Sequence, residues 1–421
     1  MPDQSARAAA AVDSRRLWED LRNLAQLGAR ADGGVGRLAL DENDVKARLW
    51  LVEQGRALGC SVRMDAAANV FLRLPGGDEN LPPVVTGSHM DSQPAGGAYD
   101  GAYGVLAGLA ALRAVHEARI ATRRPLEVVA WTNEEGVRFS PGTSGSACFV
   151  GVRSLEETRA LTDGEGISFG EAADACLARL EAQGVPTADF ATPMSAFVEL
   201  HIEQGPVLER AGARAGVVTG IQGVSWFEFT VRGTANHAGT TPRAARRDAL
   251  EGACALAVAL REQARDDADE TRFTIGRFRV SPDSVNTIPD EAVFTVDLRD
   301  PDQARLDALE ATFRDLAAGE WAGCSVEVTR LSRIDPVVFP DAVTGAVAEA
   351  AERDLCMEAP RLMSGAFHDA IHLARHCPTG MIFIPCKDGV SHHPAESITP
   401  DQAEDGARLL AATLVRLAEV A

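Results

Sequence analysis

Short apolar segments alternate with longer helical ones along the first third of the chain, and this alternation restricts the fold more than any other feature of the sequence. Residues 83–87 (PVVTG) and 126–132 (LEVVAWT) are apolar runs typical of buried strands. Residues 45–58 and 104–119 have the apolar spacing of helices. Because strands that alternate with helices form a sheet covered on both faces, the pattern predicts an α/β domain with a mostly parallel sheet.

The pattern changes between about residues 220 and 335. Strands are predicted at 225–233, 271–280, 292–298 and 325–331, and helices at 248–265 and 301–318. This β-α-β-β-α-β order is that of a ferredoxin-like sandwich. Helix–strand alternation then resumes in residues 362–421. We therefore predict that a larger domain is interrupted by an inserted one, with segments at 1–219, 220–333 and 334–421.

The composition excludes several classes of protein. The 421 residues suggest two or three domains, and 61 acidic against 41 basic residues give a net charge of −20. Phosphate binding needs clustered Lys and Arg, so this charge argues against a nucleic-acid or anionic-membrane partner. The sequence contains neither a membrane-spanning apolar run nor the apolar core of a signal peptide near its start. The eight cysteines form no CxxC pair, so we expect reduced thiols and a cytoplasmic protein.

Polar side chains follow the first apolar strand directly. His89, Asp91 and Asp100 lie in two glycine-flanked segments, 87–92 (GSHMDS) and 96–101 (GGAYDG). Ligands of parallel sheets bind beyond the carboxyl ends of strands, and imidazole with carboxylate is a ligand set that suits a divalent ion such as Zn²⁺. Asp91 is placed to accept the second ring N–H of His89. The alternative is an ordinary turn with a capping residue.

Two adjacent glutamates follow the next strand, in the segment 132–136 (TNEEG). Glu134 and Glu135 point to different sides, so one can bind a metal while the other acts as a general base and later protonates a leaving nitrogen. The residue pattern does not show which glutamate binds the metal and which acts as the base. The alternative is a turn with two solvated acids.

Two further segments add histidines: 199–206 (ELHIEQGP) with His201, and 389–394 (GVSHHP) with His392 and His393. A histidine on a strand can be a packed residue, and a histidine pair can belong to an ordinary loop. The chain has only nine histidines, however, and these lie in segments bounded by Gly and Pro. Together, these five segments favour a metal site.

These segments belong to a longer series of motifs: GSHMDSQPAGGAYDG, TNEEGVRF, ELHIEQGP, NHAGTTP, RRDAL, VNTIP, VDLRD, SGAFHDA and GVSHHPAE. In this order, from about residue 20 to the C-terminus, the chain resembles the hydantoinase/carbamoylase family of binuclear-metal amidases, in the clan of zinc aminoacylases and carboxypeptidases. The family includes N-carbamoyl-L-amino acid hydrolases, β-ureidopropionases and allantoate amidohydrolases. The resemblance implies a metallohydrolase domain with an inserted dimerisation or lid domain, and a homodimer.

The resemblance also implies a role for each ligand. His89 and His392 would each hold one metal ion, Asp100 would bridge the two ions, and Glu135 and His201 would complete the two spheres. Two divalent ions per subunit are expected. Zn²⁺ is the first choice, and Mn²⁺, Co²⁺ or Ni²⁺ would suit the same ligands.

Catalytic and substrate-binding residues are implied in the same way. Glu134 would be the general base, with Asp91 and His237 as further catalytic residues. The substrate contacts would be Gln204, His237, Asn286 and Arg299, and His237 would reach into the active site of the neighbouring subunit. The planar fork of Arg299 suits a substrate carboxylate.

Alternatives remain for two of these residues, and the sequence departs from the family pattern at two others. Arg299 could instead pair with Asp297 or Asp300, and His237 could be an ordinary loop histidine. Phe367 in SGAFHDA stands where many members carry Gly, which leaves the width of the pocket open. His393, where members vary, makes the assignment of His392 depend on alignment to the preceding GVS.

We therefore expect a metal-dependent amidohydrolase that cleaves the C–N bond of an N-carbamoyl-L-amino acid or N-carbamoyl-β-alanine. The products would be the amino acid, CO₂ and ammonia. One alternative substrate is allantoate or a related ureide. A non-catalytic ligand-binding module is the alternative from another class. Such a module would have lost a ligand or the base, but all six of those positions are occupied.

Overall fold

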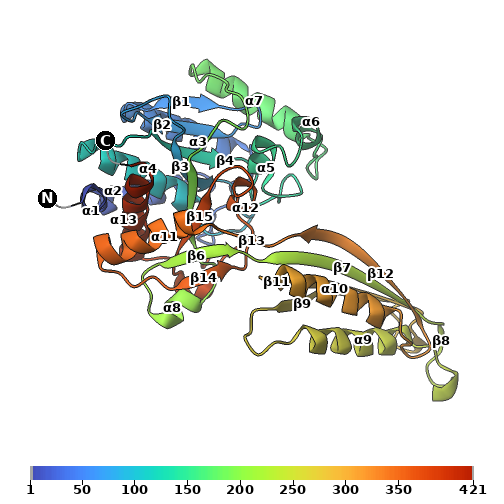
Figure 1. The fold of residues 1–421 in the computed structure, drawn as a ribbon. Coiled ribbons are helices and arrows are strands. Elements are labelled where there is room, and N and C mark those ends of the chain that lie inside the picture. Colours follow the sequence, from blue (N-terminus) through green and yellow to red (C-terminus); the bar gives the residue numbers. More distant parts are fainter. Residues whose placement is uncertain (1–2, 420–421) are drawn as a thin grey trace. The chain divides into compact units, whose positions relative to one another are not determined.

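The chain divides into two compact units in a computed structural model that describes residues 3–419 (Figure 1). The first unit comprises Met1–Thr219 and Phe339–Ala421, and the second comprises Gly220–Val338. The predicted insert ends at residue 333, whereas strand β12 (Ser325–Ile334) runs past this point. Ile334 still pairs with Val224 of β7 (Gly223–Arg232), and the second unit continues to Val338.

A nine-stranded sheet forms the centre of the first unit. The main strand order is β1-β2-β4-β3-β5-β15-β6-β13, and β14 pairs with β6. The four central strands are mutually parallel: β4 (Leu126–Trp131), β3 (Val84–His89), β5 (Ala196–Ile202) and β15 (Thr379–Ile384). All their residues are buried, as expected for parallel strands covered on both faces. The predicted mostly parallel sheet is confirmed in this central part.

Antiparallel pairing occurs towards the edges of this sheet. On one side are β1 (Ser61–Met64) and β2 (Val70–Leu74). On the other are β6 (Gly216–Ile221), β13 (Val337–Val338) and the short strand β14 (Arg361–Ser364). A hairpin explains the first of these edges, because the turn between β1 and β2 is too short for the crossover that parallel strands require.

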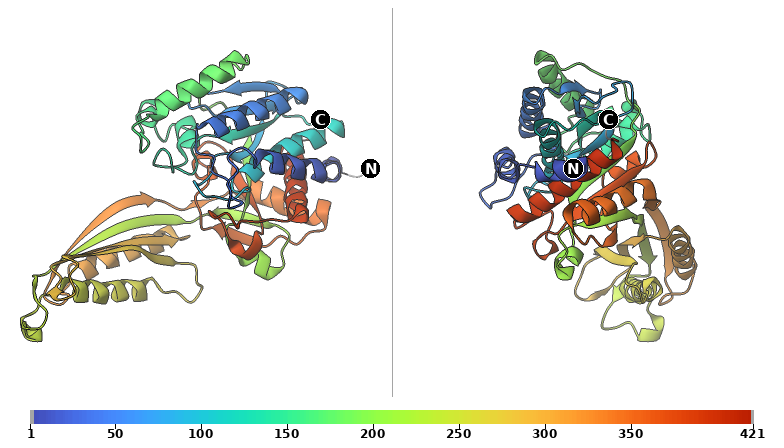
Figure 2. Two further views of the ribbon diagram at one scale, coloured as in Figure 1. Left: turned by 180° about the vertical axis from the view of Figure 1, so that it is seen from behind. Right: turned by 60° about the vertical axis from the view of Figure 1, so that its left-hand side comes forward.

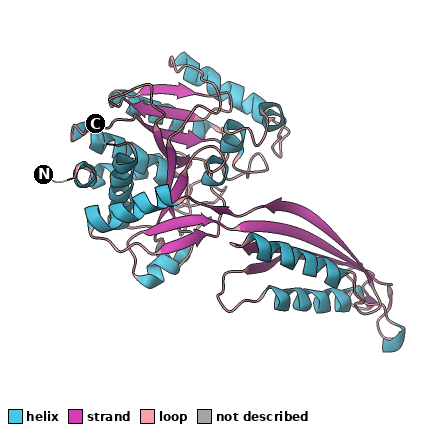
Figure 3. Cartoon of the chain, viewed as in Figure 1, coloured by secondary structure: helices cyan, strands magenta, loops and turns pink. Residues whose placement is uncertain are grey.

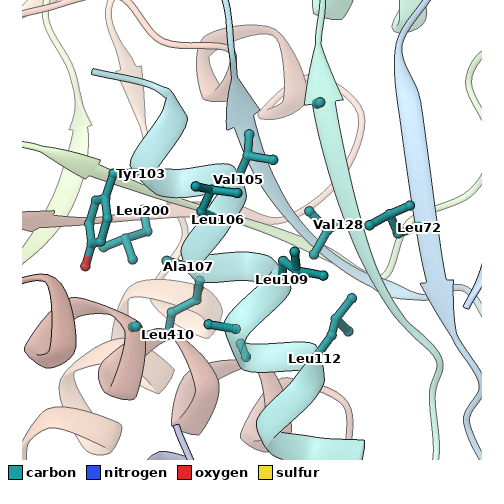
Figure 4. Packing of buried hydrophobic residues seen from close by; sticks show 14 of the residues in the cluster. Leu72, Tyr103, Val105, Leu106, Ala107, Leu109, Leu112, Val128, Leu200 and Leu410 are labelled. Atoms are coloured by element: carbon teal, nitrogen blue, oxygen red, sulfur yellow. The ribbon is translucent and has the colours of Figure 1, made fainter. Parts of the chain in front are cut away.

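One face of the sheet is covered by helices α4 (Ala102–Glu117) and α13 (Pro400–Leu417). Side chains of α4 such as Leu109 and Leu112 lie among Val128 and Leu72 of the sheet, and Leu410 of α13 lies on the other side of α4 (Figure 4). Because α4 is enclosed from two sides, it is apolar around most of its circumference. The same apolar core includes α1 (Gln4–Ala10), α2 (Ser14–Leu24), α3 (Glu42–Ala57) and α11 (Asp341–Glu349). Helix α1 lies beside α13 (Figure 2).

The opposite face is covered by aromatic rings and two short helices, α5 (Ser144–Phe149) and α12 (Ala370–Leu373). Trp131 contacts Phe71, Phe149 and Phe197 with ring centroids 5.3–6.2 Å apart. The remaining helices of this unit are α6 (Leu155–Arg159), α7 (Phe169–Ala182), α8 (Val207–Ala211), the π-helical turn Ala350–Asp354 and the 3₁₀ turn Lys387–Gly389. No helix in the described part of the chain is long and apolar enough to cross a membrane.

The second unit has a four-stranded antiparallel sheet with helices on one face (Figure 3). Its strands, in the order β12-β7-β11-β9, are β12, β7 (Gly223–Arg232), β11 (Glu291–Asp300) and β9 (Arg272–Ser281). Helices α9 (Ala249–Ala264) and α10 (Gln303–Ala317) pack on the sheet around Phe227, Phe229 and Phe294. Along the chain these elements follow the predicted β-α-β-β-α-β order. A small ribbon of β8 (Asn236–His237) and β10 (Thr287–Ile288) and the 3₁₀ turn Arg243–Ala245 were not predicted.

The parallel strands bring polar segments to one edge of the sheet. His89 ends β3, the glutamate segment follows β4, and His201 lies near the end of β5. Gly101 then starts α4 in a conformation with φ 63° and ψ −52°, which residues with a side chain rarely adopt. A Cβ atom on Gly101 would lie 2.3 Å from the His89 ring. The approach of this turn to His89 therefore requires glycine.

Replacing Gly101 with Ala should lower the free energy of unfolding by about 2–4 kcal/mol, through backbone strain and crowding against His89. Chemical denaturation with circular dichroism measures this loss. Gly164→Ala is the matched control, because Gly164 is exposed and a Cβ there meets nothing within 4 Å. A Gly101→Ala protein as stable as the control would contradict this account of the turn.

Candidate active site

Two groups of potential metal ligands share Asp100 in the first unit. One group contains His89, Asp100 and His201, and the other contains Asp100, Glu135 and His392. Asp100 Oδ1 lies 3.1 Å from His201 Nε2 and 3.6 Å from His89 Nε2, whereas Oδ2 lies 3.2 Å from His392 Nε2. Each carboxylate oxygen thus faces a different group. This arrangement fits two neighbouring divalent ions with Asp100 between them.

In both strand histidines, Nδ1 is held by a backbone carbonyl and Nε2 faces Asp100. His89 Nδ1 lies 2.9 Å from the carbonyl oxygen of Asp91, and His201 Nδ1 lies 2.9 Å from that of Ile202. A carbonyl only accepts, so each Nδ1 carries the proton and donates it. In a neutral ring, each Nε2 therefore keeps a lone pair. On His201 it accepts the N–H of Gly101 at 3.1 Å, which leaves both histidines in the tautomer that a metal ion requires.

Asp91 orients its neighbours in a different way from the one predicted. Its carboxylate oxygen is 3.8 Å from His89 Nδ1, too far for a hydrogen bond, and its backbone carbonyl accepts that proton instead. The carboxylate accepts the backbone N–H groups of Glu134 and Glu135, at 3.3 and 3.2 Å. Asp91 therefore fixes the turn that carries the two glutamates.

The two glutamates point to different ligands, as the sequence suggested. Glu134 Oε2 lies 3.4 Å from His89 Nε2, and Glu135 Oε2 lies 3.5 Å from His392 Nε2. Gln93 donates to Glu135 Oε2 at 2.6 Å, whereas Oε1 is buried and has no hydrogen-bond partner among the described residues. Burial raises the pKa of Glu135 to about 7, with Asp100 adding to the shift, and burial raises the pKa of Glu134 well above its usual value. A bound cation would offset this concentration of buried carboxylates.

In a third group of possible ligands, formed by Glu199, His201 and His368, both Glu199 oxygens and His368 Nε2 already have hydrogen-bond partners. Glu199 accepts hydrogen bonds from Ser88 Oγ at 2.7 Å and from the backbone N–H of Ala370 at 2.9 Å. His368 Nε2 lies 2.9 Å from the Ser364 hydroxyl, and burial lowers the pKa of His368 well below its usual value. The His368 ring contacts the His201 ring edge-on, with centroids 4.5 Å apart. This group supports His201 rather than forming another ion site.

Sequence reasoning missed the supporting roles of Glu199 and His368. Both lie in motifs that carried the family resemblance, ELHIEQGP and SGAFHDA. Their position in those motifs was the available signal. Their contacts with His201 could not be inferred from spacing alone.

Gln204 contacts Asp100, one of the candidate ligands. Its Nε2 donates to Asp100 Oδ2 at 2.8 Å and lies 3.2 Å from Ser391 Oγ. Its Oε1 is buried with no partner among the described residues, so it is the atom that could accept a substrate N–H. Gln204 and His392 both have positive φ, 58° and 55°. Such strained backbone is often retained at functional sites.

The segments that carry His237 and Asn286 lie side by side in the second unit. Thr287 pairs with His237 across the β8–β10 ribbon, and the backbone N–H of Ala238 donates to the carbonyl of Asn286 at 3.0 Å. His237 Nδ1 accepts the N–H groups of Gly239 and Thr240, at 3.0 and 3.2 Å. The proton of a neutral His237 ring therefore sits on Nε2, and this exposed side chain offers an N–H donor.

Arg299 forms the ion pair that the sequence left as an alternative. Its Nε and Nη2 donate to the two carboxylate oxygens of Asp297, at 3.0 and 2.9 Å. The other candidate partner, Asp300, accepts a hydrogen bond from Thr271 Oγ1 at 2.7 Å. A substrate carboxylate would therefore share Arg299 with Asp297. Phe367, in the first unit, is partly buried and directly precedes His368.

Comparison with known proteins gives matches over nearly the whole chain. Residues 85–416 match the sequence model of peptidase family M20/M25/M40. The chain is 38% identical over 413 residues to an N-carbamoyl-L-amino-acid amidohydrolase of Rhizobium meliloti, covering 97% of each protein. It is 37% identical over 398 residues to allantoate amidohydrolase of Bacillus subtilis, covering 94% of this chain and 95% of that relative. A crystal structure of a hydantoinase/carbamoylase family amidase from Burkholderia multivorans superposes with a TM-score of 0.90 at 42% identity, covering 97% of this chain and 98% of that one.

The two adjacent histidines allow a sharp test of the site. His392 Nε2 faces Asp100 and Glu135, whereas His393 Nδ1 accepts the backbone N–H of Ala395 at 3.0 Å. His392→Ala should therefore bind less divalent metal than the wild type, and His393→Ala should keep the wild-type metal content. Metal analysis by mass spectrometry after dialysis measures the content per chain. The reverse result would show that the alignment is displaced by one residue here.

Proposed function

Because the chain belongs to peptidase family M20/M25/M40 and resembles its hydantoinase/carbamoylase members, we propose that it hydrolyses N-carbamoyl amino acids to the amino acid, CO₂ and ammonia. The family resemblance carried by the sequence motifs is confirmed by these comparisons. The single observation that carries the proposed chemistry is the position of Asp100 between two ligand groups, with Glu134 beside them.

The proposal includes two divalent metal ions. His89 and His201 would hold one ion, Glu135 and His392 the other, and Asp100 would bridge them. When bound, such ions polarise the scissile carbonyl and make a water molecule nucleophilic near neutral pH. Zn²⁺ is our first choice, and Mn²⁺, Co²⁺ or Ni²⁺ suit the same nitrogen and oxygen donors.

Glu134 is proposed as the general base. Its carboxylate lies beside His89 but outside both ligand groups, so it remains available to accept a proton. It would take a proton from the attacking water and pass it to the amino nitrogen of the departing amino acid. Cleavage of that C–N bond leaves carbamate, which decomposes to CO₂ and ammonia.

The second unit is proposed to supply the substrate contacts. The Nε2–H of His237 would donate to the carbamoyl oxygen as negative charge develops there. Asn286, whose carbonyl accepts the backbone N–H of Ala238 next to His237, would add a polar contact, and Arg299 would bind the substrate carboxylate. In the first unit, Gln204 Oε1 would accept a ureido N–H.

We further propose a homodimer in which His237 serves the active site of the partner subunit. The family resemblance supports this arrangement. The second unit also exposes Trp226, 42% accessible, on a strand of its antiparallel sheet. Apolar sheet surface of this kind is suited to burial against an identical copy. We also propose a cytoplasmic location, which the eight unpaired cysteines support.

Allantoate is the second candidate substrate. The allantoate amidohydrolase of Bacillus subtilis is nearly as similar to this chain as the carbamoyl-amino-acid enzyme. Both substrates present a ureido group next to a carboxylate, and the residues described above address those two features. Hydrolysis of allantoate would therefore use the same site.

An ammonia-release assay tests the proposed function. The metal-loaded enzyme should act on N-carbamoyl-L-amino acids, with N-carbamoyl-β-alanine and allantoate as the comparison substrates. Exhaustive chelation and dialysis should abolish turnover, and a divalent ion should restore it. Full activity after chelation would remove the metal mechanism, and turnover of allantoate alone would favour the second candidate.

Mixing two inactive variants tests the proposed dimer. His237→Ala lacks the donor, and Glu134→Gln keeps the shape of the base but should lose about 10²–10⁴-fold in kcat. In a heterodimer, one active site would contain both intact groups. Random exchange makes half of the dimers mixed, so the mixture should recover up to about a quarter of wild-type activity. No recovery, with exchange shown by mass spectrometry, would mean that His237 acts within its own chain or not at all.

A further inference from the structure

Glu396 joins two loops of the metal centre that are far apart in the sequence. It is 5% exposed, and its Oε1 accepts the backbone N–H groups of Tyr99 and Asp100, at 2.9 and 3.0 Å. Its Oε2 accepts the hydroxyl of Ser391 at 3.0 Å. One carboxylate therefore connects the backbone of Asp100 with the residue that precedes His392.

The network continues to the carboxylate of Asp100. Ser391 Oγ lies 3.0 Å from Asp100 Oδ2, and Gln204 Nε2 lies within hydrogen-bonding distance of both. Ser391 has one hydroxyl proton, so it donates to one of the two carboxylates at a time while it accepts from Gln204. Together, Glu396, Ser391 and Gln204 connect the side chain and the backbone of Asp100 to the His392 segment.

The Asp100 loop has room for this carboxylate only because of Gly97. A Cβ atom on Gly97 would lie 2.1 Å from the carboxyl carbon of Glu396. The segment that carries Glu396 is itself folded as a turn, since the N–H of Glu396 donates to the carbonyl of His393 at 3.0 Å. The two loops are therefore shaped around the carboxylate, which is not a mobile surface group.

The five proposed ligands are held in two different ways. His89 and His201 lie on strands β3 and β5, whose backbone hydrogen bonds fix them. Asp100, Glu135 and His392 lie in loops, and His392 also has an exposed side chain (50%). Asp91 holds the turn of Glu135. Asp100 and His392 depend on other hydrogen bonds from outside the sheet, and Glu396 provides bonds to both of their loops.

We infer that Glu396 is a positioning residue that keeps Asp100 and His392 at the spacing needed to hold the second divalent ion. Its Oε1 accepts two backbone N–H groups, its Oε2 lies within hydrogen-bonding distance of the Ser391 hydroxyl, and it belongs to neither ligand group, so we expect it to act through the two ligands. The inference rests on the proposed two-metal function. It predicts that loss of Glu396 affects one ion much more than the other.

Zn²⁺ titration of the metal-free, full-length protein tests this inference, with a chromophoric chelator as competitor. Wild-type protein should bind two ions per chain. Glu396→Ala should bind one ion with wild-type affinity and the other about 10–100-fold more weakly, as is typical when a residue that orients a ligand is lost. Glu396→Gln keeps an oxygen for the two backbone N–H groups, so the same ion should weaken by less than about tenfold.

Asp41→Ala is the matched control for a purely structural loss. Asp41 also accepts three backbone N–H groups, those of Leu38, Asn43 and Asp44, all within its own segment. This variant should lose stability but bind both ions as wild type does. A selective effect on one ion, partly rescued by Gln, is a result that general destabilisation does not produce.

The outcomes separate this inference from the proposed function. Wild-type protein that binds fewer than two ions overturns both. Wild-type protein that binds two ions, with a Glu396→Ala variant that binds both equally well, overturns only the role of Glu396. If the alanine variant does not fold by circular dichroism, the glutamine variant decides alone, and unchanged binding of both ions then overturns the inference.

Discussion

The rest of the site depends on the contacts of the buried Asp100 carboxylate. Its two oxygens face three imidazole rings, those of His201 and His89 on one side and of His392 on the other. Glu134 and Glu135 add further buried acid groups, and burial raises the pKa of both. Histidines alone offset this charge only when they are protonated. Divalent cations would offset it while leaving the imidazole nitrogens as ligands, so charge and geometry lead to the same proposal.

The fold holds the residues of this site in place in two ways. The parallel strands bring the ends of β3, β4 and β5 to one edge, where strand hydrogen bonds fix His89 and His201. The loops cannot rely on that regularity. They depend on glycines that allow close approach, such as Gly101, and on side chains that bond to loop backbone, such as Asp91 and Glu396.

Much of this could be predicted from the sequence because it is encoded locally. Strand and helix periods gave the elements of both units, and polar segments directly after apolar strands indicated the candidate ligands. The partners of Asp91, Glu199, His368 and Glu396 could not be predicted. Their hydrogen bonds join groups that lie far apart in the sequence or belong to the backbone, and neither the period of an element nor the spacing of a motif indicates such contacts. The β8–β10 ribbon escaped prediction for a related reason, since strands of two residues are too short to show a period.

The division of the chain into two units also divides the proposed chemistry. The first unit contains the groups that would act on the ureido carbon, which N-carbamoyl amino acids and allantoate share. Discrimination between these substrates must then come from groups that contact the rest of the molecule. Arg299 is proposed to bind the carboxylate, which both substrates also share, and its bidentate pair with Asp297 means that a substrate carboxylate would compete with a resident one. A carboxylate that binds Arg299 must therefore also be held by neighbouring groups, which links affinity to the correct placement of the whole substrate.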